Sequence, residues 1–126
     1  MSALASALNQ VVSKLQTAPG CRTVRVLETH EFSDEQFAFK VRAEFAAGNL
    51  QVRVYQNAAH TDYAYQWFRD ELPVLRWDNK EHFPAIHTHP HHFHSATGVV
   101  AESPLIGDPA RDLPVVLNYL VVLFTE

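Results

Sequence analysis

Residues 37–45 read FAFKVRAEF, and apolar and polar side chains alternate along the whole stretch. Successive side chains of a β-strand point to opposite faces, so the alternation predicts a strand with one face in a core. The apolar set is Phe37, Phe39, Val41, Ala43 and Phe45, and the polar set is Lys40, Arg42 and Glu44. The stretch therefore predicts a sheet that is covered on one face and polar on the other.

Neighbouring segments repeat this β character on both sides of the stretch. Strands are predicted at 23–29, 50–55, 62–69 and 74–78, with a last one at 99–103. Turn signals separate them at intervals of about 8–13 residues, a spacing that is typical of an antiparallel meander. No interval has room for the crossover that a parallel sheet needs. We therefore expect five or six antiparallel strands.

Helices are predicted at both ends of the chain. The first has one apolar face, formed by Leu4, Leu8, Val11, Val12 and Leu15. Asp108 or Asp112 begins the second, which is apolar on nearly all sides. We expect this second helix to be deeply buried or to contact a homodimer partner or another protein through Tyr119, Leu123 or Phe124. The sequence thus predicts a single α+β domain over residues 1–126, with an antiparallel five- to six-stranded sheet flanked by an N-terminal and a C-terminal helix.

Composition narrows the class of protein. Hydrophobic residues make up 47% and charged residues 19% of the chain, which excludes wholesale disorder. The single cysteine, Cys21, excludes an intramolecular disulfide and indicates a reducing compartment. The net charge of −4 argues against a generally basic nucleic-acid-binding protein. The longest apolar run is about ten residues where about 20 would span a bilayer, and no signal segment is evident. We therefore expect a cytoplasmic protein that is not bound to a membrane.

Histidine is the outlier in this composition. Six of the eight histidines lie between His82 and His94. Imidazoles at this density suit metal ligation or proton transfer, and the third alternative is a solvated loop with structural hydrogen bonds. Asp78, Glu81 and Glu102 are the carboxylates available to a metal. We expect the loop to bind Zn²⁺ or Ni²⁺ weakly, with no metal or other cofactor required for activity.

The stretch LRWDN at residues 75–79 leads from a predicted strand into the histidine-rich segment. On a strand, Arg76 and Asp78 share a face. The planar fork of arginine suits a phosphate or a carboxylate, and an aspartate can fix the tautomer of a histidine. The alternative is an internal ion pair between Arg76 and Asp78.

The polar face of the predicted sheet offers another candidate surface. Lys40, Arg42, Arg53 and Tyr55 come from neighbouring strands and form a basic patch that includes an aromatic ring. Such a patch can hold a nucleic-acid backbone. The alternative is the solvated face of a half-exposed sheet.

Four motifs resemble, in order and spacing, the TumE family of toxin–antitoxin toxins. They are YAYQW at 63–67, LRWDN at 75–79, HFP at 82–84 and THPHHFH at 88–94. Phe83 stands where the family usually has a second histidine, and Glu81 replaces a common proline. The resemblance implies an intracellular bacterial toxin that a neighbouring antitoxin holds inactive. We expect that antitoxin to be a small helix-turn-helix protein.

Many small toxins of such systems cleave RNA, so we predict a toxin that acts on RNA as a metal-independent endoribonuclease. His91, His92 and His94 would supply the acid and the base, Arg76 would stabilise charge on the phosphate, and Asp78 would orient a histidine. The candidate substrate-binding residues are Tyr63, Tyr65, Asn79, His82, His89, Lys40, Arg42 and Arg53. The alternatives are a histidine-rich protein that binds divalent metal and a non-catalytic interaction module.

Overall fold

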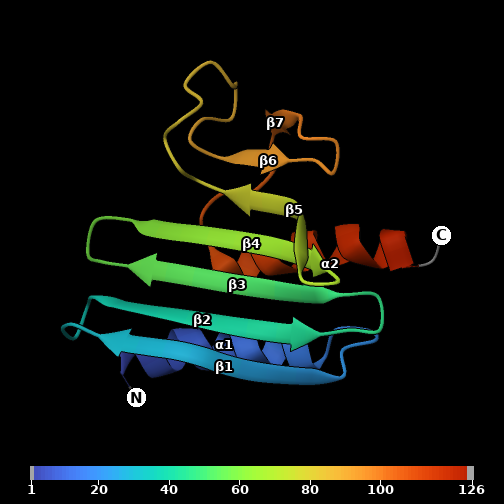
Figure 1. Ribbon diagram of the computed structural model, residues 1–126. Helices are drawn as coiled ribbons and strands as arrows, with labels where there is room; N and C mark the ends of the chain where they lie inside the picture. Colours follow the sequence, from blue (N-terminus) through green and yellow to red (C-terminus); the bar gives the residue numbers. More distant parts are fainter. Residues whose placement is uncertain (1, 125–126) are drawn as a thin grey trace.

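Seven antiparallel strands form one sheet in the computed structural model, which describes residues 2–124 of the chain. The strands are β1 (Thr23–Glu31), β2 (Phe37–Glu44), β3 (Asn49–Gln56), β4 (Thr61–Arg69), β5 (Leu72–Asp78), β6 (His92–His94) and β7 (Val100–Glu102). Each strand pairs with the next one along the chain (Figure 1), which confirms the predicted meander.

The predicted number of five or six strands is wrong, because residues 92–94 form a strand within the histidine-rich segment, where the sequence analysis predicts none. β6 is only three residues long, and its HFH pattern places imidazoles where a strand usually carries apolar side chains. Pairing with β5 on one side and β7 on the other supplies its backbone hydrogen bonds. Neighbouring strands, rather than local propensity, therefore determine this element.

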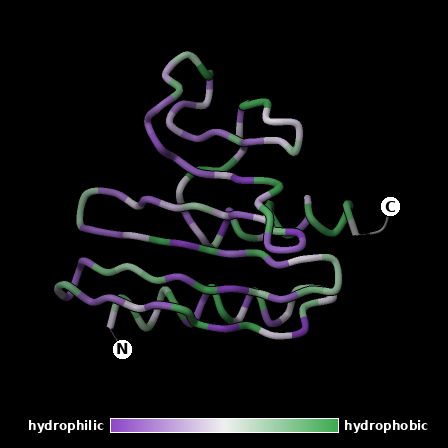
Figure 2. Tube along the Cα trace, viewed as in Figure 1, coloured by the Kyte–Doolittle hydropathy of each residue, from purple (hydrophilic) through white to green (hydrophobic). Residues whose placement is uncertain are grey.

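Two helices cover one face of the sheet and leave the other face open. Helix α1 (Ala3–Gln16) and helix α2 (Pro109–Phe124) both lie behind the strands in Figure 1. Hydropathy alternates along the central strands, as Figure 2 shows, and the apolar side chains of β2 and β3 are buried in the core between sheet and helices. The prediction of a sheet covered on one face is confirmed, and polar side chains occupy the open face.

Helix α2 is buried along one side only. Leu113, Val116 and Leu120 are fully buried, whereas Tyr119 is 44% exposed, although its ring meets the Trp77 ring edge-on. Leu123 is partly buried, and the side chain of Phe124 lies outside the described residues. The apolar helix therefore keeps a surface that the described residues 2–124 do not cover.

Two aspartates stabilise the start of α2 through hydrogen bonds to backbone N–H groups. The side chain of Asp108 accepts a hydrogen bond from the backbone N–H of Ala110 at 3.1 Å, so it is the capping residue. Asp112 is buried inside the first turn and accepts from the backbone N–H groups of Ile106 and Gly107 at 3.0 and 2.8 Å.

None of the helices within residues 2–124 is sufficiently long and apolar to cross a bilayer.

Candidate active site

The site forms where β5 and β6 pair on the open face of the sheet. The antiparallel register places Asp78 opposite His92 and Arg76 opposite His94. Side chains two residues apart on a strand point to the same face, so these four side chains gather on one side of the two strands. Trp77 and Phe93 alternate with them and face the helices, where their ring centroids are 4.8 Å apart.

Asp78 is the centre of the cluster and is only 2% exposed. Its Oδ2 accepts a hydrogen bond from Nε of Arg76 at 2.5 Å, and its Oδ1 accepts one from the backbone N–H of Lys80 at 3.0 Å. The Nε2 atom of His92 is 2.9 Å from Oδ1. A buried carboxylate is tolerated when it is paired and fully hydrogen-bonded, and these contacts meet that need.

His92 is held between two acceptor oxygens. Its Nδ1 lies 3.1 Å from the carbonyl oxygen of Pro90, and its Nε2 faces the carboxylate of Asp78. A carbonyl oxygen can only accept, so Nδ1 donates to Pro90, and Nε2 lies within ion-pair distance of the carboxylate. Because His92 is 2% exposed and both of its ring nitrogens face oxygens, it positions Asp78 and is not accessible to a substrate.

His94 differs from His92 in being accessible. Its side chain is 32% exposed, and its Nε2 is 3.7 Å from Oδ2 of Asp78, beyond ordinary hydrogen-bond length. Desolvation lowers the pKa of His94 below its usual value; Asp78 opposes that shift, and the positive charges of His92 and Arg76 add to it. His94 is therefore neutral at pH 7, and its ring is free to accept a proton.

Phe83 closes one side of the two imidazoles. Its ring meets that of His92 edge-on with centroids 4.8 Å apart, and that of His94 edge-on at 5.8 Å. At the position where TumE-like motifs usually have a second histidine, this chain thus has an apolar wall. The wall contributes to the desolvation that keeps His94 neutral. The sequence shows the departure at Phe83 but does not predict this contact.

His91 lies in a different environment from the cluster. A hydrogen bond of 2.7 Å joins its Nδ1 to the Tyr63 hydroxyl. Burial raises the pKa of Tyr63, and desolvation lowers the pKa of His91, so both side chains stay uncharged at pH 7. We assign His91 and Tyr63 to holding the histidine-rich segment against β4, not to the chemical cluster.

The remaining predicted residues from the motifs divide into buried and exposed ones. Tyr65 is fully buried in the core, where substrate does not reach it. Asn79 joins β5 to β4, because its Nδ2 donates to the Thr61 carbonyl at 2.8 Å and its Oδ1 accepts from the Tyr63 N–H at 3.1 Å. His82 and His89 are exposed on the segment between β5 and β6.

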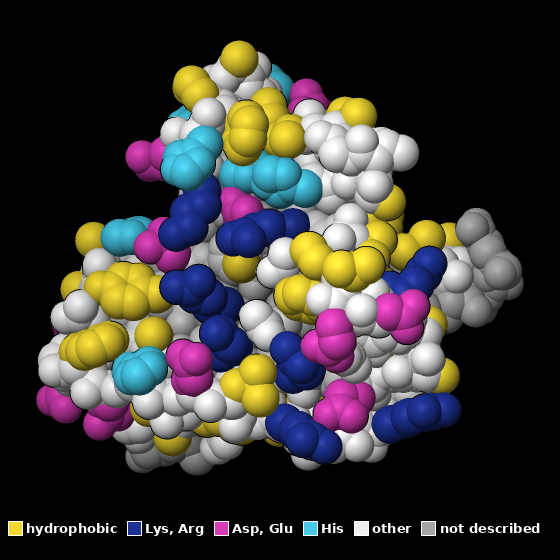
Figure 3. All heavy atoms as spheres, viewed as in Figure 1, with side chains coloured by type: hydrophobic (Ala, Val, Ile, Leu, Met, Phe, Trp, Pro, Cys, Tyr) yellow, Lys and Arg dark blue, Asp and Glu magenta, His cyan; other side chains and the backbone are white. Residues whose placement is uncertain are grey.

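The basic side chains of the open face line up with the cluster. Lys40, Arg53, Ala64, Asp78 and His92 are successive partners across β2 to β6. Lysine and arginine gather over this face next to histidines in Figure 3. Lys40 pairs with Glu28 at 3.3 Å. The patch is thus partly neutralised, and Arg53 is its exposed member.

The third predicted cation, Arg42, is held within the sheet surface. It donates to Oε1 of Gln51 at 3.1 Å and lies 3.9 Å from the Glu71 carboxylate. Its guanidinium also approaches the Phe68 ring at 5.9 Å from the centroid. Arg42 therefore contributes charge to the open face, although its buried Nε has no hydrogen-bond partner among the described residues.

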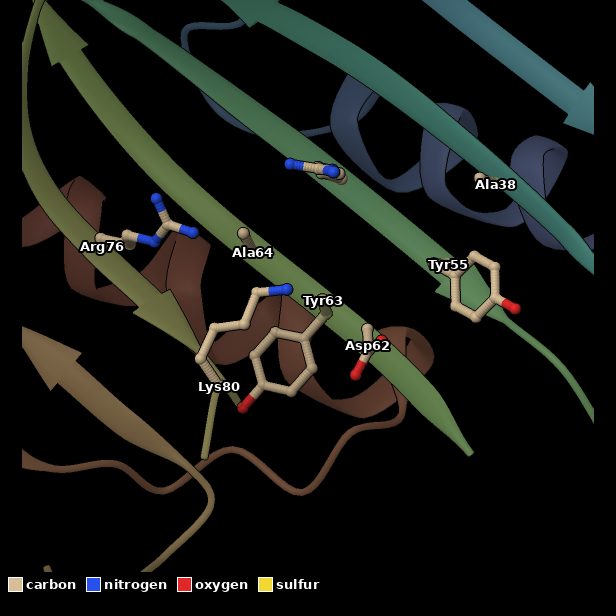
Figure 4. A pocket seen from close by; sticks show the side chains of 8 residues that line it. Ala38, Tyr55, Asp62, Tyr63, Ala64, Arg76 and Lys80 are labelled. Carbon is tan, nitrogen blue, oxygen red and sulfur yellow. The ribbon is translucent and has the colours of Figure 1, made fainter. Parts of the chain in front are cut away.

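A pocket of about 280 Å³ adjoins the cluster. Its lining residues are Ala38, Arg53, Tyr55, Asp62, Tyr63, Ala64, Arg76 and Lys80. Figure 4 shows Arg76 and Lys80 reaching from one side toward Ala64, with Tyr55 across the sheet from them. The motifs of the sequence do not single out Lys80, although its place two residues after Asp78 would put it on the same face if the strand geometry continued.

Asp78, His92 and His94 also form a candidate metal site. Their ligand atoms lie within 4.8 Å of one another, and two histidines with one carboxylate are a familiar ligand set for Zn²⁺. The guanidinium of Arg76 already forms an ion pair with the carboxylate of Asp78, and its positive charge repels a metal cation. The donor set therefore suits a metal, while its surroundings oppose one.

The family model described as Toxin TumE matches residues 11–122, a range that includes the last six residues of α1, every strand, the whole cluster and most of α2. No curated protein and no solved structure is significantly similar to the chain. The match extends well beyond the motifs that first indicated the resemblance and covers most of the sequence. This chain is therefore a member of the TumE toxin family.

Proposed function

We propose that this toxin cleaves RNA, with His94 as the proton carrier and Arg76 as the group that binds the phosphate. One observation carries the proposal. A neutral, accessible imidazole stands beside a guanidinium that a buried carboxylate holds in place, at the rim of a positively charged pocket. Together these groups match what general base catalysis on a phosphodiester requires.

The reaction needs no group from outside the protein and the RNA. The 2′-hydroxyl gives its proton to His94 and attacks the adjacent phosphorus, which forms a 2′,3′-cyclic phosphate. The bond from phosphorus to the 5′ oxygen breaks, and the protonated His94 returns the proton to that leaving oxygen. Arg76 stabilises the extra negative charge on the phosphorane, while Asp78 and His92 hold Arg76 in position.

A direct test incubates the purified protein with an RNA oligonucleotide and with DNA of the same sequence. We expect fragments with 2′,3′-cyclic phosphate ends from the RNA and none from the DNA, which lacks the 2′-hydroxyl. RNA that stays intact with wild-type protein would refute the proposal, as would fragments ending in a 5′ phosphate.

Replacing Arg76 with lysine is expected to lower the rate of cleavage by about 10²-fold. Lysine keeps the charge but loses the planar fork, which both bonds Asp78 through Nε and presents its other nitrogens to the phosphate. Arg111→Lys on the exposed start of α2 is the matched control and should cleave at the wild-type rate. Equal rates for the two variants would exclude Arg76 from the site.

The metal candidate leads to a separate prediction. We expect Zn²⁺ or Ni²⁺ to bind the Asp78, His92 and His94 cluster weakly in calorimetry, because Arg76 competes for the carboxylate. Protein treated with a chelator should keep its melting temperature and its cleavage rate. Activity that disappears with the chelator and returns with Zn²⁺ would favour the alternative, in which the cluster is a metal-dependent hydrolytic centre.

Membership of a toxin family suggests an antitoxin, and we propose that it is a small helix-turn-helix protein encoded beside the toxin. The exposed row of Val115, Tyr119 and Val122 on α2 is a candidate contact, since these side chains recur at helical spacing. A homodimer through the same row is the alternative. Light scattering of the toxin alone and with the neighbouring gene product separates the two, and Tyr119→Asp should weaken whichever complex forms.

A further inference from the structure

Three hollows follow one another on the open face, along β5 and the segment after it. The pocket around Ala64 shares Asp62 and Lys80 with a hollow that His60, His82 and Pro90 also line. On its other side it shares Arg76 with a hollow lined by His94, Gln66 and Pro73. The last of these contains the proposed proton carrier. The three hollows thus form one track that passes the chemical cluster.

The central pocket is positively charged, and its cations are available. Arg53, Arg76 and Lys80 line it against a single carboxylate, Asp62. Asp62 lies 3.4 Å from Nε2 of His60, outside the pocket lining. Within residues 2–124 neither Arg53 nor Lys80 forms an ion pair, and Arg76 contacts Asp78 through Nε alone. An anion such as a phosphate is the ligand that this arrangement favours.

The pocket also has an aromatic ring on one side and small side chains at its base. The Tyr55 ring is held in place because its hydroxyl accepts a hydrogen bond from Nε2 of Gln36 at 2.7 Å. Ala38 and Ala64 leave room beside it, because their side chains end at Cβ (Figure 4). A volume of about 280 Å³ is near the lower end of the range of small-ligand pockets, so it suits one nucleotide rather than a duplex.

We infer that the pocket around Ala64 is a nucleotide subsite for single-stranded RNA, in which a base stacks on Tyr55 and Arg53 and Lys80 hold its phosphate. The assignment of the RNA class rests on the proposed function, but binding at this subsite is separable from cleavage. A single strand is required, because only an unpaired base exposes its face to an aromatic ring. The neighbouring phosphate then lies at Arg76 and His94.

Fluorescence anisotropy with a short 5′-fluorescein-labelled 2′-O-methyl RNA tests the inference. This probe lacks the free 2′-hydroxyl, so binding is measured whether or not the protein cleaves RNA. We expect Tyr55→Ala and Ala64→Leu each to raise the dissociation constant about tenfold, the first by removing the stacking ring and the second by filling the base of the pocket. Arg53→Glu should raise it at least tenfold and reduce the dependence of binding on salt.

Matched controls place the same changes elsewhere. Ala47→Leu lies in the exposed turn between β2 and β3, and Arg111→Glu lies on α2; both should bind as the wild type does. The inference is overturned if the three pocket variants, with unchanged melting temperatures, bind like these controls, or if a duplex competes as well as the single strand. Should Ala64→Leu fail to fold, Tyr55→Ala and Arg53→Glu decide the outcome. Loss of cleavage in His94→Ala with normal binding would leave this subsite intact.

Discussion

Replacing His94 with alanine is expected to lower the rate of RNA cleavage by roughly 10²–10⁴-fold, the usual contribution of a positioned acid–base group. His94 is the member of the cluster that is both accessible and free of a close hydrogen bond to Asp78. Its removal takes away the proton carrier and leaves the bonds among Arg76, Asp78 and His92 in place. The melting temperature should therefore change little, and growth inhibition on expression should disappear.

A histidine outside the cluster serves as the control for His94. His30 lies exposed in β1, far from β5 and β6 in the strand order. His30→Ala should remain toxic and cleave RNA at the wild-type rate. If folded His94→Ala stayed fully toxic, the cluster would not be the chemical site, and the basic face around Lys40, Arg42 and Arg53 would become the better candidate.

The pH profile of cleavage gives an independent reading of His94. A general base acts only when it is neutral, and desolvation lowers the pKa of His94 from its usual value. Cleavage should therefore persist below the pH at which an ordinary histidine becomes charged, and should fall once the pH drops through the lowered pKa. Phe83→Ala opens the ring to water and should move this acidic limb toward higher pH. An acidic limb at the same pH in both proteins would contradict the role given to Phe83.

Replacing Asp78 with alanine is expected to lower the free energy of unfolding by about 3–5 kcal/mol, since it breaks the contacts of a buried carboxylate by removing one partner. His92 is 2% exposed and loses the acceptor of Nε2, Arg76 loses the acceptor of Nε, and the Lys80 N–H loses its partner as well. Urea denaturation at pH 7 measures the change.

The matched control for Asp78 is Asp62→Ala on the same face of the sheet. Asp62 pairs at 3.4 Å with His60, and both side chains are well exposed, so its removal should cost below about 1 kcal/mol. A similar small loss for Asp78→Ala would contradict the role of Asp78 as the acceptor that holds Arg76 and His92 in place.

Much of the fold follows from residues that are close together in the sequence. The alternation in residues 37–45 indicates which face of the sheet is buried, because a strand turns its side chains to opposite faces at every residue. The short turns between β2, β3, β4 and β5 allow only antiparallel neighbours. The two-residue period of a strand also places Arg76 on one face with Asp78 in β5, and His92 on one face with His94 in β6.

The roles of these two pairs depend on tertiary contacts. β6 is too short to be recognised by pattern, and its pairing with β5 sets the register that brings His92 and His94 to Asp78. Because of that register, His92 is buried between two acceptors and His94 stays accessible, while His91 faces Tyr63 instead.

Local sequence is thus sufficient to predict that histidines, an arginine and an aspartate come from adjoining segments of a one-sided sheet. It does not distinguish the buried His92 from the accessible His94. That difference depends on burial and on the pairing of Asp78 with His92 across two strands that a long segment separates in the chain. Local patterns do not encode such a contact, because they carry no information about which distant strand supplies the partner.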